Sequence, residues 1–267
     1  MNIGKKEFNW GSRTYIMGIL NRTPDSFSDG GQYIELEKAA EHAFAMAAEG
    51  ADIIDVGGES TRPGFAPVSA GMEIERVVPL IEKLSRTCDI PISVDTYRAE
   101  TAEAAIQAGA AMINDIWGLM ADPQMADVAA RYQTPVCIMH NKQVPEYDNL
   151  IEDVKKELHK SVELALKSGI KAENIILDPG IGFGKTYEHN ILLMRNLEQL
   201  KALGFPVLLG ISRKSMIGLT LDLPISQRLE GTIAANVLGI VKGADIIRVH
   251  DVEANWRAAE MTDKIIR

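Results

Sequence analysis

The 267-residue sequence has two cysteines, no long apolar run and no excess of basic residues. No apolar stretch approaches the ~20 residues that a membrane helix needs, and none behind the N-terminus has the length of a signal peptide. Cys88 and Cys137 stand in apolar or strand-like sequence, where a reduced thiol fills a core position and a metal or redox role is not expected. We therefore predict a cytoplasmic protein with no membrane contact.

Basic residues are also too few for a general nucleic-acid-binding protein. The chain has 28 lysines and arginines against 37 acidic residues, which gives a formal net charge of −9 at pH 7. Nucleic-acid binding needs a basic surface to neutralise phosphates, so this balance argues against nucleic acid as a partner. A small anionic ligand remains compatible with an acidic chain, provided that the chain gathers its cations at one site.

Several catalytic signatures are absent as well. The sequence has no paired-cysteine zinc signature, no H-E-x-x-H and no G-x-S-x-G, so no covalent nucleophile is evident. The glycine-rich stretch 179–186 comes close to a phosphate-binding loop, but Pro179 stands where G-x-x-x-x-G-K-[ST] needs glycine. Lys185 breaks the dinucleotide pattern G-x-G-x-x-G in the same way. We interpret the stretch as a loop that lets a flat ligand approach the backbone, with Phe183 packed on it.

Short apolar runs alternate with longer amphipathic stretches from residue 14 onward, which is typical of βα units in a parallel sheet. A Gly-Ala turn followed by an apolar strand recurs at Gly50, Gly109 and Gly243, where glycine suits the left-handed position that ends a helix. The predicted strands are residues 14–20, 52–56, 92–95, 112–115, 136–139, 175–178, 207–210 and 246–249. The predicted helices are residues 35–49, 73–86, 99–108, 123–132, 149–168, 189–203, 227–241 and 253–266.

Eight strand–helix pairs within this length fit a closed barrel, which has no edge strands, better than an open doubly wound sheet. We therefore predict an α/β fold, a TIM (β/α)8 barrel formed by a single domain over residues 1–267. The first thirteen residues, including 8–13, are predicted to form a short N-terminal β-hairpin that plugs the bottom of the barrel. The sequence shows no linker or second-domain boundary.

Polar and charged side chains gather at the C-terminal ends of the predicted strands. In a (β/α)8 barrel these ends converge on one face, where the βα loops build the active site. Arg62, Lys214 and Arg248 place cations there, as an anionic and phosphorylated ligand requires. Of the two histidines on this face, His250 is favoured as a site residue and His140 is the weaker candidate. The remaining polar residues at these ends are Asn21, Glu59, Ser60, Thr61, Asp95, Asn114, Asp115, Asn141, Asp178, Ser212, Arg213, Ser215 and Asp251.

Structural roles compete with ligand roles at the aspartates of this set. For Asp115 and Asp251 we favour a turn or a helix cap. Asp95 and Asp178 end strongly apolar strands, so their carboxylates are predicted to be partly buried and to need hydrogen-bond donors. For these two, we favour contact with a ligand.

The stretch from Asn21 to Gly31 is longer than a plain connection of about 4–6 residues, and it is either a functional lid or ordinary surface. Asn21 is the first polar side chain past the strand. Its amide oxygen suits a Mg²⁺ ion that keeps most of its waters and shares the phosphates of the ligand. We therefore predict Mg²⁺ as the cofactor.

Most of the polar strand ends, all but His140 and Asn141, belong to seven longer motifs, which are residues 17–31, 55–64, 93–96, 113–115, 178–185, 210–215 and 248–252. As an ordered set they resemble the dihydropteroate synthases of bacterial folate synthesis, over essentially the whole chain. The first, second and fifth motifs are the most specific. Arg22 is a departure, because the family commonly has an apolar residue there, and it is predicted to add a cation beside the metal position.

The resemblance implies that 4-aminobenzoate displaces diphosphate from 6-hydroxymethyl-7,8-dihydropterin diphosphate to give 7,8-dihydropteroate. It also implies a homodimer and loops that close over the substrates and exclude water. The implied catalytic residues are Asn21, Arg62, Asp95, Lys214, Arg248 and His250. The implied pterin contacts are Asp95, Asn114, Asp178 and Lys214, and the diphosphate contacts are Asn21, Thr61, Arg62, Arg248 and His250. The implied aminobenzoate and lid residues are Asp25, Ser26, Phe27, Thr61, Arg62, Pro63, Phe183 and Ser215.

Two other functions remain open at the level of sequence. A pterin-dependent methyltransferase barrel, which passes a methyl group from a tetrahydrofolate to a corrinoid protein, would share the carboxylate and amide contacts to the pterin. It has no evident need for the cations or for the loop at residues 23–27. A catalytically silent pterin-binding barrel is disfavoured because the anion site and both loops are intact in the sequence.

Overall fold

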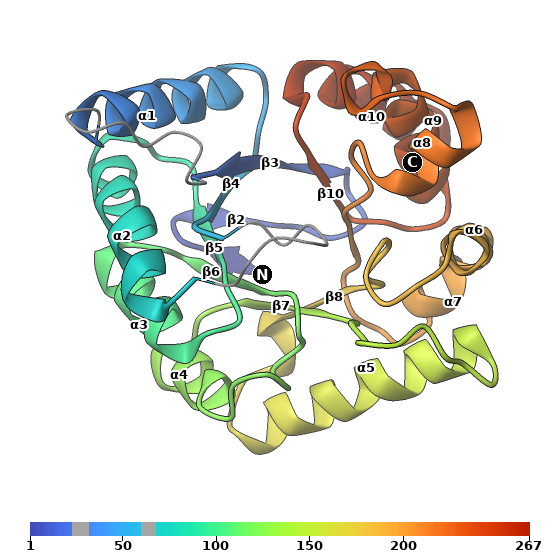
Figure 1. The fold of residues 1–267 in the computed structure, drawn as a ribbon, viewed down its shortest axis with the longest axis horizontal. Helices are drawn as coiled ribbons and strands as arrows, with labels where there is room; N and C mark the ends of the chain where they lie inside the picture. The colour runs from blue at the N-terminus through green and yellow to red at the C-terminus, as the bar shows by residue number, and fades with distance from the viewer. Residues whose placement is uncertain (23–31, 60–67) are drawn as a thin grey trace.

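The computed structural model describes residues 1–22, 32–59 and 68–267. Its main sheet contains eight parallel strands in the order β8-β7-β6-β5-β4-β3-β10-β9, and a single bridge between Leu177 and Val207 joins the two ends into a barrel. Helices surround this barrel (Figure 1), which confirms the predicted TIM-barrel fold. The strands are β3 (Tyr15–Asn21), β4 (Ile53–Gly57), β5 (Ile92–Asp95), β6 (Met112–Asp115), β7 (Val136–Met139), β8 (Ile175–Asp178), β9 (Leu208–Leu209) and β10 (Ile246–Val249).

The helices follow the predicted pattern, apart from shifts of up to three residues at their ends and two larger differences. The predicted helix at 189–203 is broken at Asn196, whose backbone leaves the helical region (φ −119°, ψ 22°) and whose side-chain amide donates to Leu192 O. The short helix α8 was not predicted. The helices are α1 (Gln32–Ala48), α2 (Ala70–Thr87), α3 (Ala99–Ala108), α4 (Met125–Tyr132), α5 (Leu150–Lys167), α6 (Tyr187–Arg195), α7 (Glu198–Lys201), α8 (Ser215–Leu221), α9 (Leu229–Val241) and α10 (Val252–Ile266), with single 3₁₀ turns η2 (Ala172–Asn174) and η3 (Ile225–Gln227). Across the described residues, no helix combines the length and the apolar character needed to cross a membrane.

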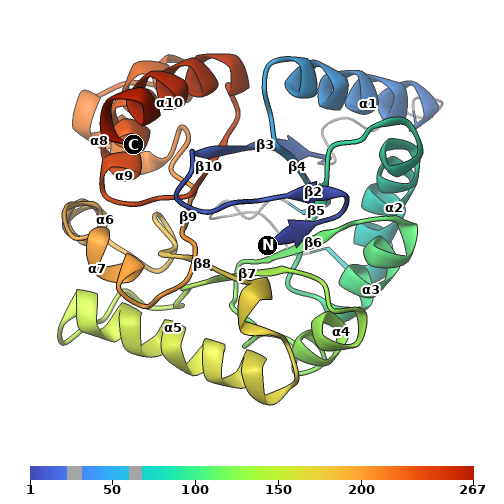
Figure 2. The same cartoon turned by 180° about the vertical axis from the view of Figure 1, so that it is seen from behind.

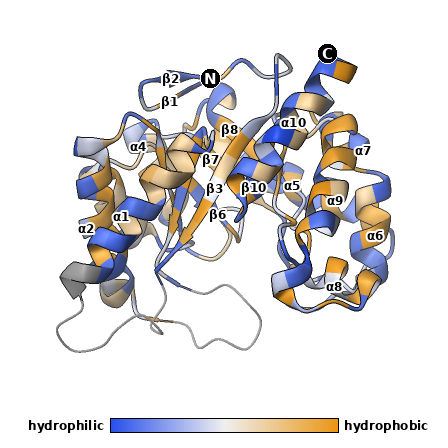
Figure 3. Cartoon of the chain, turned by 90° about the horizontal axis from the view of Figure 1, so that it is seen from above, coloured by the Kyte–Doolittle hydropathy of each residue, from blue (hydrophilic) through white to orange (hydrophobic). Residues whose placement is uncertain are grey.

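One end of the barrel is closed by the N-terminal hairpin. Strands β1 (Asn2–Ile3) and β2 (Lys6–Glu7) pair antiparallel ahead of residues 8–13, and Figure 2 shows them lying across the barrel. Ile3 and Phe8 pack into the apolar interior of the barrel, as predicted for a plug. Figure 3 places this hairpin at the end of the molecule opposite α8. The interior layer consists of Tyr15, Met17, Ile53, Met112, Cys137, Ile176, Leu208 and Ile246.

The interior changes from apolar to polar one step further along the strands. Because strand side chains alternate between the two faces, a residue two positions after an interior residue also faces the interior. Asp55, Asp178 and Arg248 follow the interior residues Ile53, Ile176 and Ile246 by two positions, so they form the next interior layer. The second set of side chains, between the strands and the helices, is apolar and forms the main core. The fold therefore presents a polar floor at the C-terminal ends of the strands.

Candidate active site

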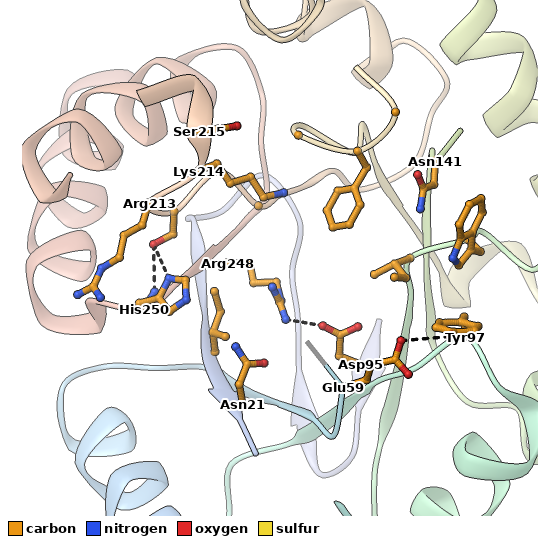
Figure 4. A pocket seen from close by; sticks show the side chains of 18 of the residues that line it. Asn21, Glu59, Asp95, Tyr97, Asn141, Arg213, Lys214, Ser215, Arg248 and His250 are labelled. Carbon is orange, nitrogen blue, oxygen red and sulfur yellow. Dashed lines mark hydrogen bonds and ion pairs between the residues drawn. The ribbon is translucent and has the colours of Figure 1, made fainter. Parts of the chain in front are cut away.

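A cavity of about 700 Å³ opens above this polar floor. Its walls come from the C-terminal ends of several strands and the loops that follow them, as the barrel architecture predicts. Figure 4 shows Lys214 and Arg248 directed into the cavity from neighbouring segments. Seven of the residues with an implied catalytic or substrate-binding role line it, namely Asn21, Asp95, Phe183, Lys214, Ser215, Arg248 and His250. Four other polar residues predicted at the strand ends also line it, namely Glu59, Asn141, Ser212 and Arg213.

Arg248 is the centre of the floor. Its Nε donates to Asp55 Oδ2 at 2.6 Å and its Nη2 donates to Asp95 Oδ2 at 2.6 Å. Asn114 Nδ2 donates to the same Asp55 oxygen at 3.0 Å. Burial disfavours the charge of Arg248, but the carboxylates of Asp55 and Asp95 outweigh that cost and raise its pKa. The guanidinium is thereby fixed as a cation in the cavity.

Asp95 has one carboxylate oxygen left without a donor. Among the described residues, Asp95 Oδ1 is buried and has no hydrogen-bond partner, while Oδ2 binds Arg248. Burial raises the pKa of Asp95 to about 7, and the charge of Arg248 opposes that rise. A buried acceptor without a donor costs about 1–3 kcal/mol. The side chain therefore lacks a donor that a ligand with N–H groups can supply.

Asp178 and Asn114, the other predicted pterin contacts, lie in the polar layer and do not line the cavity itself. Asp178 Oδ1 accepts a hydrogen bond from Gly180 N at 2.7 Å. Burial raises the pKa of Asp178, and Lys214 opposes that rise. The position of Asp178 is thus tied to the glycine-rich loop that follows β8.

The glycine-rich loop forms the wall beside Lys214. Gly180 has φ +69°, and a Cβ there would lie 1.8 Å from His140 O, so only glycine fits this close approach. Lys214 Nζ donates to Ile181 O and lies 4.4 Å from the centroid of the Phe183 ring. Burial lowers the pKa of Lys214 to about 8. The loop thus places an aromatic face and an ammonium group side by side.

His250 is oriented by Ser212. The Oγ of Ser212 accepts from His250 N at 3.2 Å and lies 3.0 Å from His250 Nδ1 (Figure 4). With Oγ accepting from the backbone, its proton is available to Nδ1, which favours the tautomer that carries hydrogen on Nε2. His250 lines the cavity, so this tautomer gives the site an additional N–H donor.

Two structural interpretations from the sequence have different outcomes. Asp115 is a turn former as predicted, because its carboxylate accepts from Trp117 N at 2.8 Å and from Leu119 N at 2.7 Å. Asp251 stands at the N-cap of α10 but makes no capping bond, so the predicted capping role is wrong. It pairs instead with Arg213, which lines the cavity, through Nε–Oδ2 at 3.0 Å and Nη2–Oδ1 at 2.5 Å.

The prediction that Arg22 adds a cation beside the metal position is also wrong. The side chain is buried against α2, where its Nη1 donates to Arg76 O at 2.6 Å. It does not line the cavity, whereas its neighbour Asn21 does. Because strand side chains alternate, the residue after an inward-facing Asn21 faces outward.

The roles of Asp55 and of a cluster of Glu59, Glu73, Tyr97 and Arg98 beside the cavity were not predicted from the sequence. Glu59 Oε2 accepts from Arg98 Nη2 at 2.8 Å, and Glu59 Oε1 accepts from Tyr97 OH at 3.2 Å. Arg98 also donates from Nη1 to Glu73 Oε2 at 2.8 Å. Two-residue alternation from Ile53 would have found Asp55, but nothing in the sequence indicates which carboxylates Arg98 binds.

The residues present fit a magnesium ion that is shared with a ligand. Within residues 1–22, 32–59 and 68–267, no group of three or more His, Cys, Asp or Glu side chains forms a metal cage. Asn21 is exposed and lines the cavity, and an amide oxygen suits an ion whose other ligands are water and phosphate. Six predicted site residues lie outside the described residues, namely Asp25, Ser26, Phe27, Thr61, Arg62 and Pro63.

Comparison with known proteins gives consistent matches. The family model described as pterin binding enzyme matches residues 17–250. Dihydropteroate synthase of Clostridium beijerinckii is 60% identical over 268 residues, which cover 100% of both chains. The crystal structure of dihydropteroate synthase from Clostridium difficile in the presence of pteroic acid has a TM-score of 0.95 and 55% identity, covering 98% of this chain and 100% of that chain. Dihydropteroate synthase from Xanthomonas albilineans in complex with 7,8-dihydropteroate has a TM-score of 0.87 and 41% identity, covering 95% and 94%.

Proposed function

This chain belongs to the family of pterin-binding enzymes and, within it, to the dihydropteroate synthases, and we propose that the cavity above Arg248 is where it joins the two substrates. The reaction forms 7,8-dihydropteroate and diphosphate from 4-aminobenzoate and 6-hydroxymethyl-7,8-dihydropterin diphosphate. The single observation that supports this location most strongly is Asp95, which lines the cavity with one buried oxygen lacking a donor. The relatives give no support to the methyltransferase or the silent binding protein.

The pterin ring is proposed to lie on the polar floor. Its N–H and NH₂ groups are donors, and Asp95 Oδ1 is an acceptor that needs one. The ammonium of Lys214, held at Ile181 O, can donate to the ring carbonyl. Phe183 offers an apolar face beside that ammonium for aminobenzoate. Asn114 and Asp178 support this arrangement from the layer beneath, through Asp55 and Gly180 respectively.

The diphosphate is proposed to lie against the donors of His250 and Arg248. Both side chains line the cavity, and the tautomer set by Ser212 directs an N–H of His250 toward it. Asn21 would hold Mg²⁺ in common with the phosphate oxygens. When bound, this ion supplies positive charge that stabilises the leaving diphosphate. Arg62 and Thr61 complete the proposed diphosphate site in the part of the chain that lies outside the described residues.

The proposed order is departure of diphosphate before attack by the amine. The C–O bond at the pterin methylene breaks, diphosphate leaves with the electron pair, and the electron-rich pterin delocalises the positive charge that remains. The carboxylates of Asp55 and Asp95 keep Arg248 charged and in place beside the departing group. The amine of aminobenzoate then forms the C–N bond and releases a proton.

The homodimer is proposed to form through the outer face of α9. This helix carries Ala234, Leu238 and Val241 on one side at helical spacing, and Leu238 and Val241 are 43% and 56% exposed. Figure 3 shows apolar colouring along α8 and α9 on that side of the molecule. A helix that is apolar on its outer face as well as its inner face is typical of one covered by a partner. A second copy of the chain is a self-complementary occupant.

Binding of aminobenzoate tests the proposed site. Calorimetric titration with 4-aminobenzoate should give a signal only when Mg²⁺ and pyrophosphate are both present, because the diphosphate completes the aminobenzoate pocket. Titration with 6-hydroxymethylpterin should give binding in either condition. If pterin binds but the affinity for aminobenzoate does not depend on Mg²⁺ and pyrophosphate, the result would contradict the synthase site and favour the methyltransferase arrangement.

The compartment that we propose is the reducing cytoplasm. The free thiols of Cys88 and Cys137 suit it.

A further inference from the structure

Lys185 ends the glycine-rich stretch but does not point outward to a ligand as the lysine of a phosphate-binding loop does. Its Nζ donates back to two carbonyl oxygens of its own loop, Gly180 O at 3.0 Å and Phe183 O at 3.0 Å. The third donor direction is taken by His140 Nδ1 at 2.8 Å. All three protons of the ammonium group therefore have acceptors inside the protein.

His140 is held in the orientation that Lys185 needs. Its Nε2 lies 2.9 Å from Glu157 Oε2 on α5, and a carboxylate only accepts, so the proton of the neutral ring lies on Nε2. Nδ1 is then a lone pair facing Lys185. Burial lowers the pKa of His140 to about 3, which keeps the ring neutral. Glu157, His140 and Lys185 thus form a hydrogen-bonded chain from the surface of α5 to the inside of the loop.

The opposite side of the same loop holds Lys214. Ile181 O accepts from Lys214 Nζ, and the Phe183 ring lies under that ammonium group. Gly182 packs against the stem of Lys214, since a Cβ built on it would lie 3.1 Å from Lys214 Cδ. The carbonyls of Gly180 and Phe183 face Lys185, and the carbonyl of Ile181 faces Lys214. Gly180 O also accepts from Phe183 N at 3.1 Å, whereas the directions of Ile181 O and Phe183 O depend on the lysine that binds each of them.

We propose that Lys185, oriented by His140 and Glu157, is a positioning residue that fixes the backbone of residues 180–183 and so places Lys214 and Phe183 in the substrate cavity. Without the ammonium group of Lys185, Phe183 O loses its donor and Gly180 O keeps only Phe183 N at 3.1 Å. The loop must then turn the carbonyl of Phe183 toward another donor. That rotation moves Ile181 O and the Phe183 ring away from Lys214. This inference rests on the proposed function, because it takes pterin as the ligand that Lys214 contacts.

The test measures the Kd of 6-hydroxymethylpterin by calorimetry in the full-length protein. Lys185→Met keeps an unbranched side chain that is one heavy atom shorter and removes its donors, and we expect the Kd to rise about 10- to 100-fold. The matched control is Lys242→Met. Lys242 also donates to a backbone carbonyl, Arg195 O at 2.8 Å, but does so away from the cavity, so its Kd should equal that of the unmodified protein.

Binding of pyrophosphate with Mg²⁺ separates positioning from general damage. Asn21 and His250, its proposed contacts, do not belong to the loop, so Lys185→Met should bind pyrophosphate as the unmodified protein does. A variant that is merely unstable would lose both ligands or neither. Equal loss of both affinities would overturn the inference.

A second pair of variants tests the positioning role of Lys185 if Lys185→Met does not fold. His140→Asn presents an amide oxygen where Nδ1 stands, whereas His140→Leu presents no acceptor. We expect the Asn variant to recover most of the pterin affinity that the Leu variant loses. A folded Lys185→Met or His140→Leu protein with an unchanged pterin Kd would overturn the inference alone. Failure of the unmodified protein to bind pterin would overturn the proposed function as well.

Discussion

At the scale of single residues, Asp95 has two oxygens in different situations. Oδ2 is held by Arg248 at 2.6 Å, and Oδ1 is buried without a donor from the described residues. Replacement of Asp95 by asparagine puts an amide nitrogen opposite either the guanidinium of Arg248 or a pterin N–H. Either pairing sets donor against donor, so the carboxylate and not merely its shape is required.

We therefore expect Asp95→Asn to weaken binding of 6-hydroxymethylpterin by roughly 1–3 kcal/mol, the cost of mispairing one buried polar group. Calorimetry measures the change, and thermal melting establishes that the variant is folded. The control is Asp89→Asn, because Asp89 is almost fully exposed and its ion pair with Lys5 spans 3.7 Å. An unchanged affinity in Asp95→Asn would show that Asp95 is not the pterin contact.

The pH dependence of pterin binding follows from three groups, Asp95, Lys214 and Lys185. The pKa of Asp95 is raised to about 7 in the free protein, and donors of the pterin favour its ionised form, so affinity should rise as pH increases toward 7. The pKa of Lys214 is lowered to about 8, and its protonated form donates to the ring, so affinity should fall as pH passes 8. Burial also lowers the pKa of Lys185 to about 7, and its protonated form holds the loop beside Lys214, so affinity should begin to fall above pH 7. Tightest binding is expected near pH 7.

Titrations at several pH values in the unmodified protein and in Asp95→Asn check this prediction. The variant should lose the rise on the acidic side and keep the fall on the alkaline side, while ionisation of the ligand itself is common to both proteins. Identical pH profiles would contradict the role of Asp95.

The position of a residue in its strand explains which site residues could be predicted from the sequence and which could not. Asn21, Asp95, Arg248 and His250 stand at strand ends, where βα loops expose them, and the structure brings all of them to one cavity. Asp55 lies inside β4, and only its alternation with Ile53 marks it as facing the interior. Its partner Arg248 is 193 positions away in sequence, and no local pattern specifies so distant a contact.

At the scale of elements, the loop after β8 depends on glycine at a particular place. A Cβ at Gly180 would lie 1.8 Å from His140 O, whereas nothing lies within 4 Å of a Cβ at Gly204, although φ is positive at both positions. Gly204→Ala therefore experiences backbone strain alone. Gly180→Ala experiences the same strain and a clash with a backbone oxygen.

We expect Gly204→Ala to lower stability by about 1 kcal/mol and Gly180→Ala to lower it by more, up to about 3 kcal/mol. Only Gly180→Ala should also weaken pterin binding, because only its loop contacts Lys214. Urea denaturation and calorimetry measure the two effects. Equal stability and equal pterin affinity in the two variants would contradict the close packing of this loop.

Element boundaries were predicted well where a strand or helix has a strong pattern of its own. Strands β5, β6, β7, β8 and β10 and helix α3 have the predicted limits. The break between α6 and α7 depends on one asparagine side chain that turns back to Leu192 O, an interaction without a periodic signature. Helix α8 is seven residues long, which is too short for an apolar pattern to reveal it among the polar residues of the site.

In the molecule as a whole, the apolar residues that stabilise the barrel and the polar residues of the cavity lie toward opposite ends of the barrel axis. Ile3, Phe8 and the interior apolar layer lie at the end with the hairpin, and Arg248 with its carboxylates lies toward the other end. The outer face of α9 is a third region, on the side of the molecule and away from both ends (Figure 3).

The proposed homodimer makes that third region testable. Leu238→Arg places a charge on the outer face of α9 and should convert the protein to a monomer. Leu166→Arg is the control, because Leu166 on α5 is equally exposed, at 45% against 43%, but lies outside the proposed contact. Sedimentation velocity gives the mass of each variant. A dimer that persists in Leu238→Arg would exclude this face.

Turnover of the two substrates is the decisive measurement for the proposed function of the cavity. The full-length protein, supplied with Mg²⁺, 4-aminobenzoate and 6-hydroxymethyl-7,8-dihydropterin diphosphate, should form 7,8-dihydropteroate and diphosphate in equal amounts, measured by chromatography of both products. Omission of aminobenzoate should abolish dihydropteroate. Absence of both products from a protein shown to be folded by its thermal melt would contradict the assignment of this cavity to dihydropteroate synthesis.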